Sequence, residues 1–397
     1  MKNFLSFLNN ELPLNCMQII YATYQFFPDY RTNTFQSIST INNFIDKEID
    51  VELVYPDRKK TNKNFEEFYK INNKFKLTKI KHTKKYEYKS QTLSNKLIYI
   101  FNHFLFAKRV KNYLKKYKND FILYTRSPYI LFTSRNNQNK IVYEVHQITR
   151  ISKLLIRQSI KKNKKILFVV LTPYIEKAIQ RLGVDKNNTV YLETGYDEKL
   201  FFEIENHRKE QNSELTRFIF GGSLDISGES KKLEKIILAF NDLVTENKLQ
   251  NCILSIYCSN QDEKELLDKF IFTENIKDCI QTYNRIPSQD FYYELFMSDI
   301  GLLPLPDTHH VNSFSSSMKF FEYIRAGLVI LCSNVEANKR FDYEKSVFIE
   351  NDSGSIKKGI LESVKILGEE KDFDMEKIKE YSYENRIEKI INKINSF

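Results

Sequence analysis

Short apolar runs alternate with longer amphipathic stretches along most of the chain. Each apolar run is nearly uninterrupted, which is typical of parallel strands that are covered on both faces. The first runs predict a strand at 17–23, a helix at 33–46 and a second strand at 50–55. This alternation of strand and helix predicts an α/β protein.

The alternation is interrupted once and then restarts. Residues 201–216, "FFEIENHRKEQNSELT", are polar and lack an apolar period, so we predict a linker there. The elements predicted beyond it are strand 217–221, helix 231–246, strand 252–258, helix 262–270, strand 279–282, helix 288–297, strand 299–304, helix 316–325 and strand 328–332. Two doubly wound, Rossmann-like domains are expected, at residues 1–205 and 206–375, facing each other across a cleft. Residues 376–397 are helical in period.

The composition supports two globular domains, and the charge is distributed unevenly between the two halves of the chain. The chain has 397 residues, of which 42% are hydrophobic and 28% charged. Residues 1–200 contain 36 Lys and Arg against 17 Asp and Glu, and the remainder contains 25 against 34. The basic first half suggests an anionic partner, namely a membrane surface, a nucleic acid or an acidic substrate. Nucleic acid is disfavoured, because no groove-binding motif or aromatic platform accompanies the basic residues.

The cysteines and the apolar runs narrow the class of protein further. There are five Cys and no CxxC pair, so a disulfide framework and a zinc site are unsupported and a cytoplasmic location is expected. The amino-terminal segment is a poor signal peptide. Apolar runs stay below the roughly 18 residues that a membrane-spanning helix needs.

A basic amphipathic helix is predicted over residues 92–118. Its apolar stripe consists of Leu93, Leu97, Ile100, Phe101, Phe104 and Leu105. Its basic end consists of Lys108, Arg109, Lys111, Lys115, Lys116 and Lys118. The stripe either faces the core, with a solvated lysine tail, or docks on anionic lipid on the inner face of the plasma membrane. A second basic run at 157–165 would extend such a surface.

The stretch "SSSMKFFEYIRAGLVILCS", residues 315–333, is the strongest candidate for chemistry. Ser315 or Ser316 can cap the helix, whose amino end would face the carboxyl edge of the sheet and attract an anion. The spacing of Ser315, Lys319 and Glu322 puts them on one helix face. Gly327 stands where a helix carboxyl cap is expected. The alternative is that Lys319 and Glu322 are simply a solvated face.

Several segments resemble the retaining GT-B glycosyltransferases of family four. The stretch above is similar to a signature that reads roughly Ser-x-Pro-x-Lys-x-x-Glu-Tyr-x-x-x-Gly. "FIFGGSLDISGESKKLEKIILAF" resembles the opening of the family's donor domain, and "VYLETGYDEKLF" its interdomain segment. "VYEVHQI" resembles the strand that carries an acceptor-side His. The resemblance implies a GT-B fold, with a carboxyl-terminal helix that can cross back to the first domain.

The resemblance also implies roles for individual residues. Glu322 would bind the donor ribose, Gly222 would admit the diphosphate, and Lys231 would stabilise that diphosphate as it leaves. His146 would hydrogen-bond a hydroxyl of the donor sugar. The further contacts implied on the nucleotide side are Ser223, Ser315, Ser316 and Lys319, and on the acceptor side Tyr124 and Arg126.

The sequence departs from the family pattern at defined positions. Ser223 replaces the family's Arg, and Phe314 stands where relatives place the first Glu of a pair. Ser317 replaces the signature Pro, Thr194 replaces an Asn, and "FFPDYRTNTF" replaces the amino-terminal Gly-Gly loop. These changes bear on the identity of the donor and on the catalytic contacts.

The remaining histidines and motifs add little. We expect His309 and His310 to lie in a loop that borders the donor site, and no metal site is predicted. His82, His103 and His207 are expected to lack chemistry. P-loop and Gly-x-Gly-x-x-Gly motifs are absent from the sequence, which disfavours those nucleotide-binding classes.

The functional prediction is a glycosyltransferase that moves a sugar from a UDP- or GDP-linked donor to a glycan or lipid-linked acceptor. Retention, a role in bacterial surface polysaccharide synthesis and no required cofactor follow from the resemblance. Two alternatives remain: a nucleotide-sugar epimerase on the same fold, and a non-catalytic scaffold subunit of a glycan-assembly complex.

Overall fold

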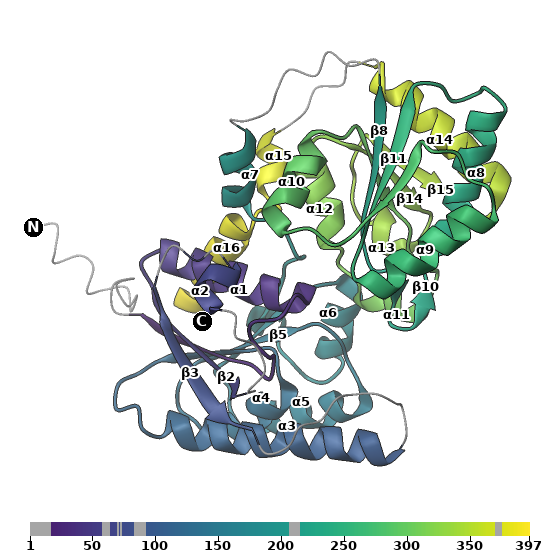
Figure 1. The fold of residues 1–397 in the computed structure, drawn as a ribbon. Coiled ribbons are helices and arrows are strands. Elements are labelled where there is room, and N and C mark those ends of the chain that lie inside the picture. The colour runs from purple at the N-terminus through teal and green to yellow at the C-terminus, as the bar shows by residue number, and fades with distance from the viewer. Residues whose placement is uncertain are drawn as a thin grey trace, which may run out of the picture. The chain divides into compact units, whose positions relative to one another are not determined.

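The chain folds into two compact α/β units, each built around a parallel sheet (Figure 1). The structure is a computed structural model that describes residues 17–57, 64–69, 71, 74–82, 93–205, 215–369 and 375–397. One unit ends at Glu193 and also contains Tyr383–Phe397, and the other is Thr194–Ser382. His207, the amino-terminal segment and residues 206–214 of the predicted linker lie outside the described residues.

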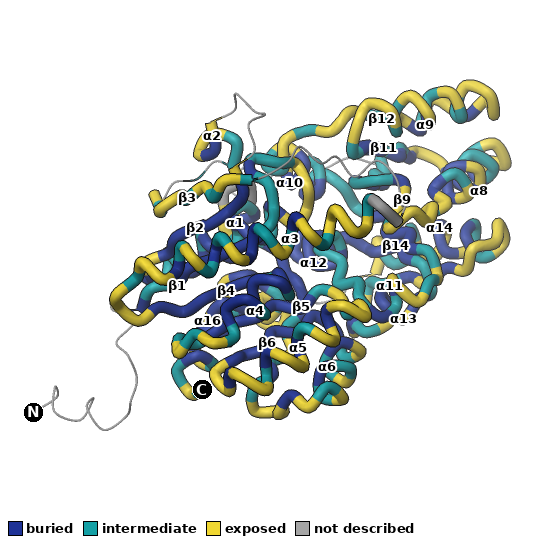
Figure 2. Tube along the Cα trace, turned by 90° about the horizontal axis from the view of Figure 1, so that it is seen from below, coloured by how far each residue is buried: buried dark blue, intermediate teal, exposed yellow. Residues whose placement is uncertain are grey.

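Within the described residues, the first unit has a seven-stranded sheet in the order β3-β2-β1-β4-β5-β6-β7. Every neighbouring pair in it is parallel. Its strands are β1 (Gln18–Ala22), β2 (Asp50–Asp57), β3 (Lys76–Lys81), β4 (Ile122–Thr125), β5 (Ile141–Val145), β6 (Ile166–Val170) and β7 (Thr189–Tyr191). Strands β4, β5 and β6 are buried along their whole length, as apolar strands covered on both faces must be (Figure 2).

The helices of the first unit cover this sheet. They are α1 (Thr32–Asp46), α2 (Phe65–Tyr69), α3 (Leu93–Leu114), α4 (Pro128–Ser134), α5 (Arg150–Lys162), α6 (Pro173–Gln180) and α16 (Tyr383–Asn395). Helix α16 belongs here although it ends the chain, because Ile387, Ile390 and Ile394 are buried in the same cluster as Ile41 and Phe44 of α1. Lys140 donates to the carbonyl of Ile394 at 2.8 Å and so binds the carboxyl end of α16.

The buried face of helix α3 differs from the apolar stripe predicted from the sequence. Leu97, Phe101 and Phe104 are exposed, whereas Phe106 and Val110 are buried. The stripe expected from the sequence therefore faces away from the core along much of its length. Both faces of this helix contain large apolar residues, so apolar spacing alone did not identify the buried one.

Within the described residues, the second unit has a six-stranded parallel sheet in the order β12-β11-β8-β13-β14-β15. Its strands are β8 (Thr216–Gly222), β11 (Cys252–Cys258), β12 (Ile280–Tyr283), β13 (Ile300–Leu303), β14 (Val329–Ser333) and β15 (Ser346–Ile349). A small antiparallel pair, β9 (Asp225–Ile226) and β10 (Glu229–Ser230), follows β8.

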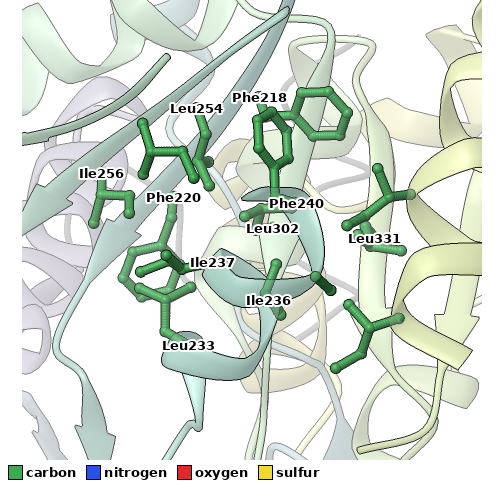
Figure 3. Packing of buried hydrophobic residues seen from close by; sticks show 14 of the residues in the cluster. Phe218, Phe220, Leu233, Ile236, Ile237, Phe240, Leu254, Ile256, Leu302 and Leu331 are labelled. Carbon is green, nitrogen blue, oxygen red and sulfur yellow. The ribbon is translucent and has the colours of Figure 1, made fainter. Parts of the chain in front are cut away.

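Helices pack on both faces of the second sheet. They are α7 (Glu198–Glu205), α8 (Leu233–Thr245), α9 (Gln261–Thr273), α10 (Ser288–Phe296), α11 (His309–Phe314), α12 (Met318–Arg325), α13 (Glu336–Lys339), α14 (Ser353–Leu367) and α15 (Met375–Lys379). On one face, Ile236 and Phe240 of α8 pack against Phe218 of β8 and Leu254 of β11 (Figure 3). The other face packs against α10 and α12.

The division between the units differs from the boundary expected after residue 205. Tyr196 and Phe201 are fully buried in the apolar cluster of the second unit, together with Ile378 of α15. This packing assigns α7 and α15 to the second unit, and only α16 returns to the first. None of the helices in the described ranges has the length and apolar character needed to cross a membrane.

Candidate functional site

Strand order defines a ligand crevice in each unit by itself. In the second sheet, β8 is central, β11 and β12 lie on one side of it, and β13 begins the other side. Connections that leave two neighbouring parallel strands in opposite directions open a crevice at their carboxyl ends, where ligands of α/β proteins bind. That switch point lies between β8 and β13. Gly222 ends β8, and α12 follows β13 along the chain.

Gly222 and Lys231 form the β8 side of this crevice. Gly222 has φ of +139°, a conformation that side-chain-bearing residues rarely adopt. A Cβ atom on Gly222 would lie 3.7 Å from Nζ of Lys231. The sequence predicted that the helix begins at Lys231. In the structure α8 begins at Leu233, because Lys232 adopts a left-handed conformation. The backbone of Gly222 and the ammonium group of Lys231 therefore lie side by side, as an anionic ligand requires.

Lys231 loses its proton at a lower pH than an ordinary lysine. Burial lowers its pKa to about 8, the Glu263 carboxylate opposes that shift, and the Lys319 ammonium group adds to it. The ring of Phe220 lies 5.5 Å from the ammonium group. An anion bound here would restore the full positive charge.

Ser223 hydrogen-bonds the carboxylate of Glu263, a residue that was not predicted from the sequence. Its hydroxyl donates to Glu263 of α9 at 2.5 Å, and Ser259 donates to the other carboxylate oxygen through both its N–H and its hydroxyl. Burial raises the pKa of Glu263, but these hydrogen bonds outweigh burial and hold it below the usual value. Ser223 thus anchors the loop after β8.

Helix α12 brings the other candidate groups to the switch point. Nζ of Lys319 lies 2.7 Å from Glu322 and 4.0 Å from the ring centroid of Phe291. Tyr292 donates to the second carboxylate oxygen of Glu322 at 3.0 Å. Glu322 is only 3% exposed, so it is not part of a solvated face. A buried carboxylate paired with a lysine can accept hydrogen bonds from ligand hydroxyls.

The ends of α12 are partly as predicted. Gly327 has φ of +78° and donates to Ile324, while Leu328 donates to Tyr323, which is a Schellman carboxyl cap. The amino end differs from the prediction, because the helix begins at Met318 and the preceding Ser317 makes no side-chain cap.

The serines before α12 have other partners than the predicted helix cap. Ser316 exchanges hydrogen bonds with Thr194, and the Ser315 carbonyl accepts from Arg340 at 2.6 Å. Ser315 therefore lies outside the helix and does not share a face with Lys319 and Glu322. The predicted cap lies too early in the chain, because the helical period of a short segment does not determine the residue at which the helix starts.

Phe314 ends the short helix α11, next to the ring of His310 at 5.5 Å. His309 hydrogen-bonds Ser313 at 2.8 Å, and both histidines are exposed. Among the described residues, no group of three or more His, Cys, Asp or Glu side chains could hold a metal ion.

The first sheet has its own switch point, between β1 and β4. Arg126 follows β4 there, and its guanidinium donates to the Asn33 carbonyl, to Ser37 and to Gln36 of α1. It also lies 2.9 Å from Nδ1 of His146, which follows β5. The structure thus brings two of the three first-domain candidates together.

The third candidate, Tyr124, is fully buried and lies behind them. Its ring stacks on Tyr21 at 5.0 Å, and its hydroxyl donates to Glu144. Burial raises its pKa well above the usual range. Tyr124 can therefore influence a ligand only through Glu144.

Glu144 and Arg386 were not predicted. Glu144 accepts from Nε2 of His146 at 2.6 Å and lies near both Arg126 and Arg386. A charged residue within the apolar strand "IVYEV" was the signal that could have identified Glu144. Arg386 gave no such signal, because it stands in an ordinary amphipathic helix far along the chain.

Comparison with known proteins identifies the fold. No family model matches the chain, and no curated protein matches its sequence. Among solved structures, HepE of Anabaena in complex with UDP matches with a TM-score of 0.65 at 11% identity, over 96% of this chain and 100% of that one. A glycosyltransferase of Rickettsia africae matches with 0.61 at 13%, over 96% and 94%. WaaG, a glycosyltransferase involved in lipopolysaccharide biosynthesis, matches with 0.56 at 13%, over 95% and 99%.

These similarities extend over nearly the whole chain. The protein therefore has the GT-B fold of glycosyltransferases, as the sequence predicted.

Proposed function

We propose that the protein is a glycosyltransferase that moves a sugar from a nucleotide-sugar donor to a glycan or lipid-linked acceptor, with retention of configuration. The observation that most supports this is the convergence of Lys231, Lys319 and Glu322 at the switch point of the second sheet. Two ammonium groups suit a diphosphate, and a buried carboxylate suits the hydroxyls of a ribose.

In this proposal, Gly222 lets the diphosphate approach the backbone, and the two lysines stabilise its charge as the bond to the sugar breaks. The donor chemistry needs no resident cofactor or metal, because the lysines meet the diphosphate charge. HepE was solved in complex with UDP, which makes a uridine diphosphate sugar the first donor to test, with a GDP-linked sugar second. The first unit would bind the acceptor, near Arg126 and His146.

The test is sugar transfer itself. Purified protein is incubated with UDP- and GDP-linked sugars, with and without candidate acceptors, and the products are identified by mass spectrometry. Acceptor-dependent transfer supports the proposal. Isomerisation of the donor sugar without transfer would indicate an epimerase, and failure to bind any nucleoside diphosphate would indicate a scaffold subunit.

A matched pair of substitutions tests the site. Glu322→Gln removes the carboxylate charge beside Lys319, and we expect UDP binding to weaken about 10- to 100-fold, because a hydrogen bond to a charged group contributes about 1.5–3 kcal/mol. Glu336→Gln is the control, since Glu336 also pairs with a lysine three residues away on a helix of the second unit but is largely exposed. Equal affinity of both variants, measured by calorimetry, would contradict the role of Glu322.

We further propose that the first unit binds anionic membrane, as synthesis of a bacterial surface polysaccharide on a lipid-linked acceptor at the inner face of the plasma membrane would require. Phe101 of α3 is 63% exposed, and Leu97 on the same helix and Leu154 on α5 are similarly exposed. Helix α4 lies between α3 and α5, in contact with both. Exposed basic residues occur on these two helices and in the turn that follows α3, namely Lys108, Lys115, Lys116, Lys153, Arg157, Lys161 and Lys162.

Exposed apolar side chains flanked by basic ones are the pattern of an interfacial surface, where each Lys or Arg adds about 1 kcal/mol near anionic lipid. Charge reversal at Lys108, Arg109, Lys115 and Lys116 should abolish salt-sensitive co-sedimentation with phosphatidylglycerol vesicles. Phe101→Ser should weaken it as well.

Phe272→Ser is the control for this experiment, because Phe272 is 88% exposed but belongs to α9 of the second unit. Vesicle binding that is unchanged by the charge reversals would refute membrane docking and leave the donor-site proposal intact.

A further inference from the structure

The first unit contains a buried cluster in which one carboxylate faces two guanidinium groups. Oε1 of Glu144 lies 3.8 Å from Nε of Arg126 and 3.5 Å from Nη2 of Arg386. All three side chains are almost completely buried. A buried cluster with more positive than negative charge is costly, so its arrangement needs a reason other than stability.

Arg386 reaches this cluster from the carboxyl-terminal helix α16. Its Nε donates to the Glu193 carbonyl at 2.9 Å, whereas its Nη1 and Nη2 atoms find no hydrogen-bond partner among the described residues. The side chain is held by the packing of α16 on α1 and is only 4% exposed. Arg386 therefore acts on Glu144 mainly through its charge, from a fixed position.

The hydrogen bonds of His146 identify its tautomer. An arginine can only donate, so the contact between Arg126 and Nδ1 requires Nδ1 to be unprotonated. The ring proton then lies on Nε2, which donates to Glu144 at 2.6 Å. Both ring nitrogens of a neutral imidazole are thereby satisfied.

This state is the reverse of the usual carboxylate–histidine pair. A carboxylate next to histidine ordinarily favours the imidazolium form. Here burial, followed by the charge of Arg126, lowers the pKa of His146 to about 4 against the opposing effect of Glu144, and Arg386 lowers it further. Burial raises the pKa of Glu144, but Arg386 and then Arg126 outweigh it and hold that pKa well below its usual range.

The other titratable groups that face the cluster stay neutral. Tyr124 of β4 donates to Glu144, and Tyr21 of β1 stacks on Tyr124. Burial raises the pKa of Tyr21 to about 12. Helix α16 contributes the guanidinium of Arg386 to the cluster, and Tyr383 of the same helix acts on that guanidinium.

We propose that Arg386 is a positioning residue for His146: together with Arg126 it keeps Glu144 ionised and fixes the imidazole as the neutral Nε2–H tautomer, so that His146 orients ligand groups without exchanging a proton. The inference rests on the proposed function only for the identity of that ligand. It makes the last helix of the chain part of the acceptor-side machinery.

The first experiment needs no substitution. Full-length protein labelled with ¹⁵N is titrated by NMR, and the His146 signals are assigned with a His146→Gln variant. We expect one protonated nitrogen, Nε2, from about pH 8 down to about pH 5. An imidazole that titrates near its ordinary value of about 6.5, or that carries its proton on Nδ1, would overturn the proposal.

The second experiment removes the distant charge. Arg386→Met should raise the pKa of His146, and Arg386→Lys should largely restore the wild-type titration because it keeps a cation there. Lys389→Met is the control, since Lys389 is exposed on the same helix. If Arg386→Met folds, as judged by circular dichroism, and His146 titrates as in the wild type, the proposal fails.

These readouts do not use a nucleotide or a sugar, so they stand apart from the test of the proposed function. If Arg386→Met does not fold, the wild-type titration and the Arg386→Lys variant still decide the matter. Once a transfer assay is available, the histidine ionisation in the pH–kcat profile of the Arg386→Met variant should lie at a higher pH than in the wild type.

Discussion

Replacing Lys231 with Met should produce opposite effects on stability and on ligand binding. In the unliganded protein, the ammonium group lies beside Gly222 with its pKa lowered to about 8, chiefly by burial. A bound diphosphate would place negative charge next to it and raise that pKa again. The Met side chain has similar length but neither suffers from burial nor attracts an anion.

The magnitude follows from the lowered pKa. In free protein at about pH 8, about half of the molecules carry a neutral Lys231, so binding a diphosphate should take up about 0.5 proton. At about pH 7 the uptake should fall to about 0.1 proton. Because the charge is lost as pH rises through about 8, affinity should decline above that pH, by up to about tenfold per unit.

Stability of the unliganded protein should change in the other direction. The pKa of Lys231 in the fold lies below its unfolded value, so the unfolded chain binds that proton more tightly and the charged lysine is a burden at neutral pH. Lys231→Met should therefore raise the free energy of unfolding at about pH 7 by about 1–3 kcal/mol. In the wild type, stability should increase between about pH 8 and about pH 10 through this group.

Calorimetry with UDP in buffers of different ionisation enthalpy measures the proton uptake, and urea unfolding measures the stability. Lys269→Met is the control, because Lys269 is exposed on α9 of the same unit. Equal proton uptake by the wild type and Lys231→Met at about pH 8, or equal affinity for UDP, would refute this role of Lys231.

Three further changes probe the fold and the site. Gly222→Ala should weaken UDP binding about tenfold or more and cost about 1–3 kcal/mol of stability, because alanine is strained at φ of +139°; calorimetry and urea unfolding measure the two effects. Gly221→Ala should destabilise the second unit severely, since its Cβ would lie 2.2 Å from the ring of Phe291. Gly368→Ala is the control and should leave the melting temperature nearly unchanged, because its Cβ would have its nearest contact at 3.5 Å. Three hydroxyl donors and Lys76 outweigh burial and lower the pKa of the Glu52 carboxyl. Glu52→Gln should therefore lower the free energy of unfolding at about pH 7 by about 1–3 kcal/mol. In the wild type this contribution should be lost as pH falls below about 4.

Much of the fold could be predicted from the chain because parallel sheets impose a simple pattern. Continuous apolar runs such as "ILFVV" in β6 can only be strands covered on both faces, and their order with the intervening helices leads to a doubly wound unit. Helix α3 was harder, because large apolar residues occur on both of its faces and only the neighbouring helix decides which one is buried.

The candidate site was predictable where adjacent residues carry it. Lys319 and Glu322 lie one helical turn apart, so their proximity is a local property of the chain. The serines before them were assigned wrongly as caps. Their partners, Thr194 and Arg340, come from distant parts of the same unit and leave no trace in the local sequence.

The sequence by itself determined the fold class, the alternation of elements and the segments at the strand ends that carry the candidate site, because these depend on periodicity and on residues close together in the chain. Only the tertiary structure decided the electrostatic state of the site. It buries Lys231 so that its charge is easily lost, engages Ser223 with Glu263, and brings Arg386 from the last helix to Glu144. Burial and through-space charge act over distances in the fold, and sequence separation does not report them.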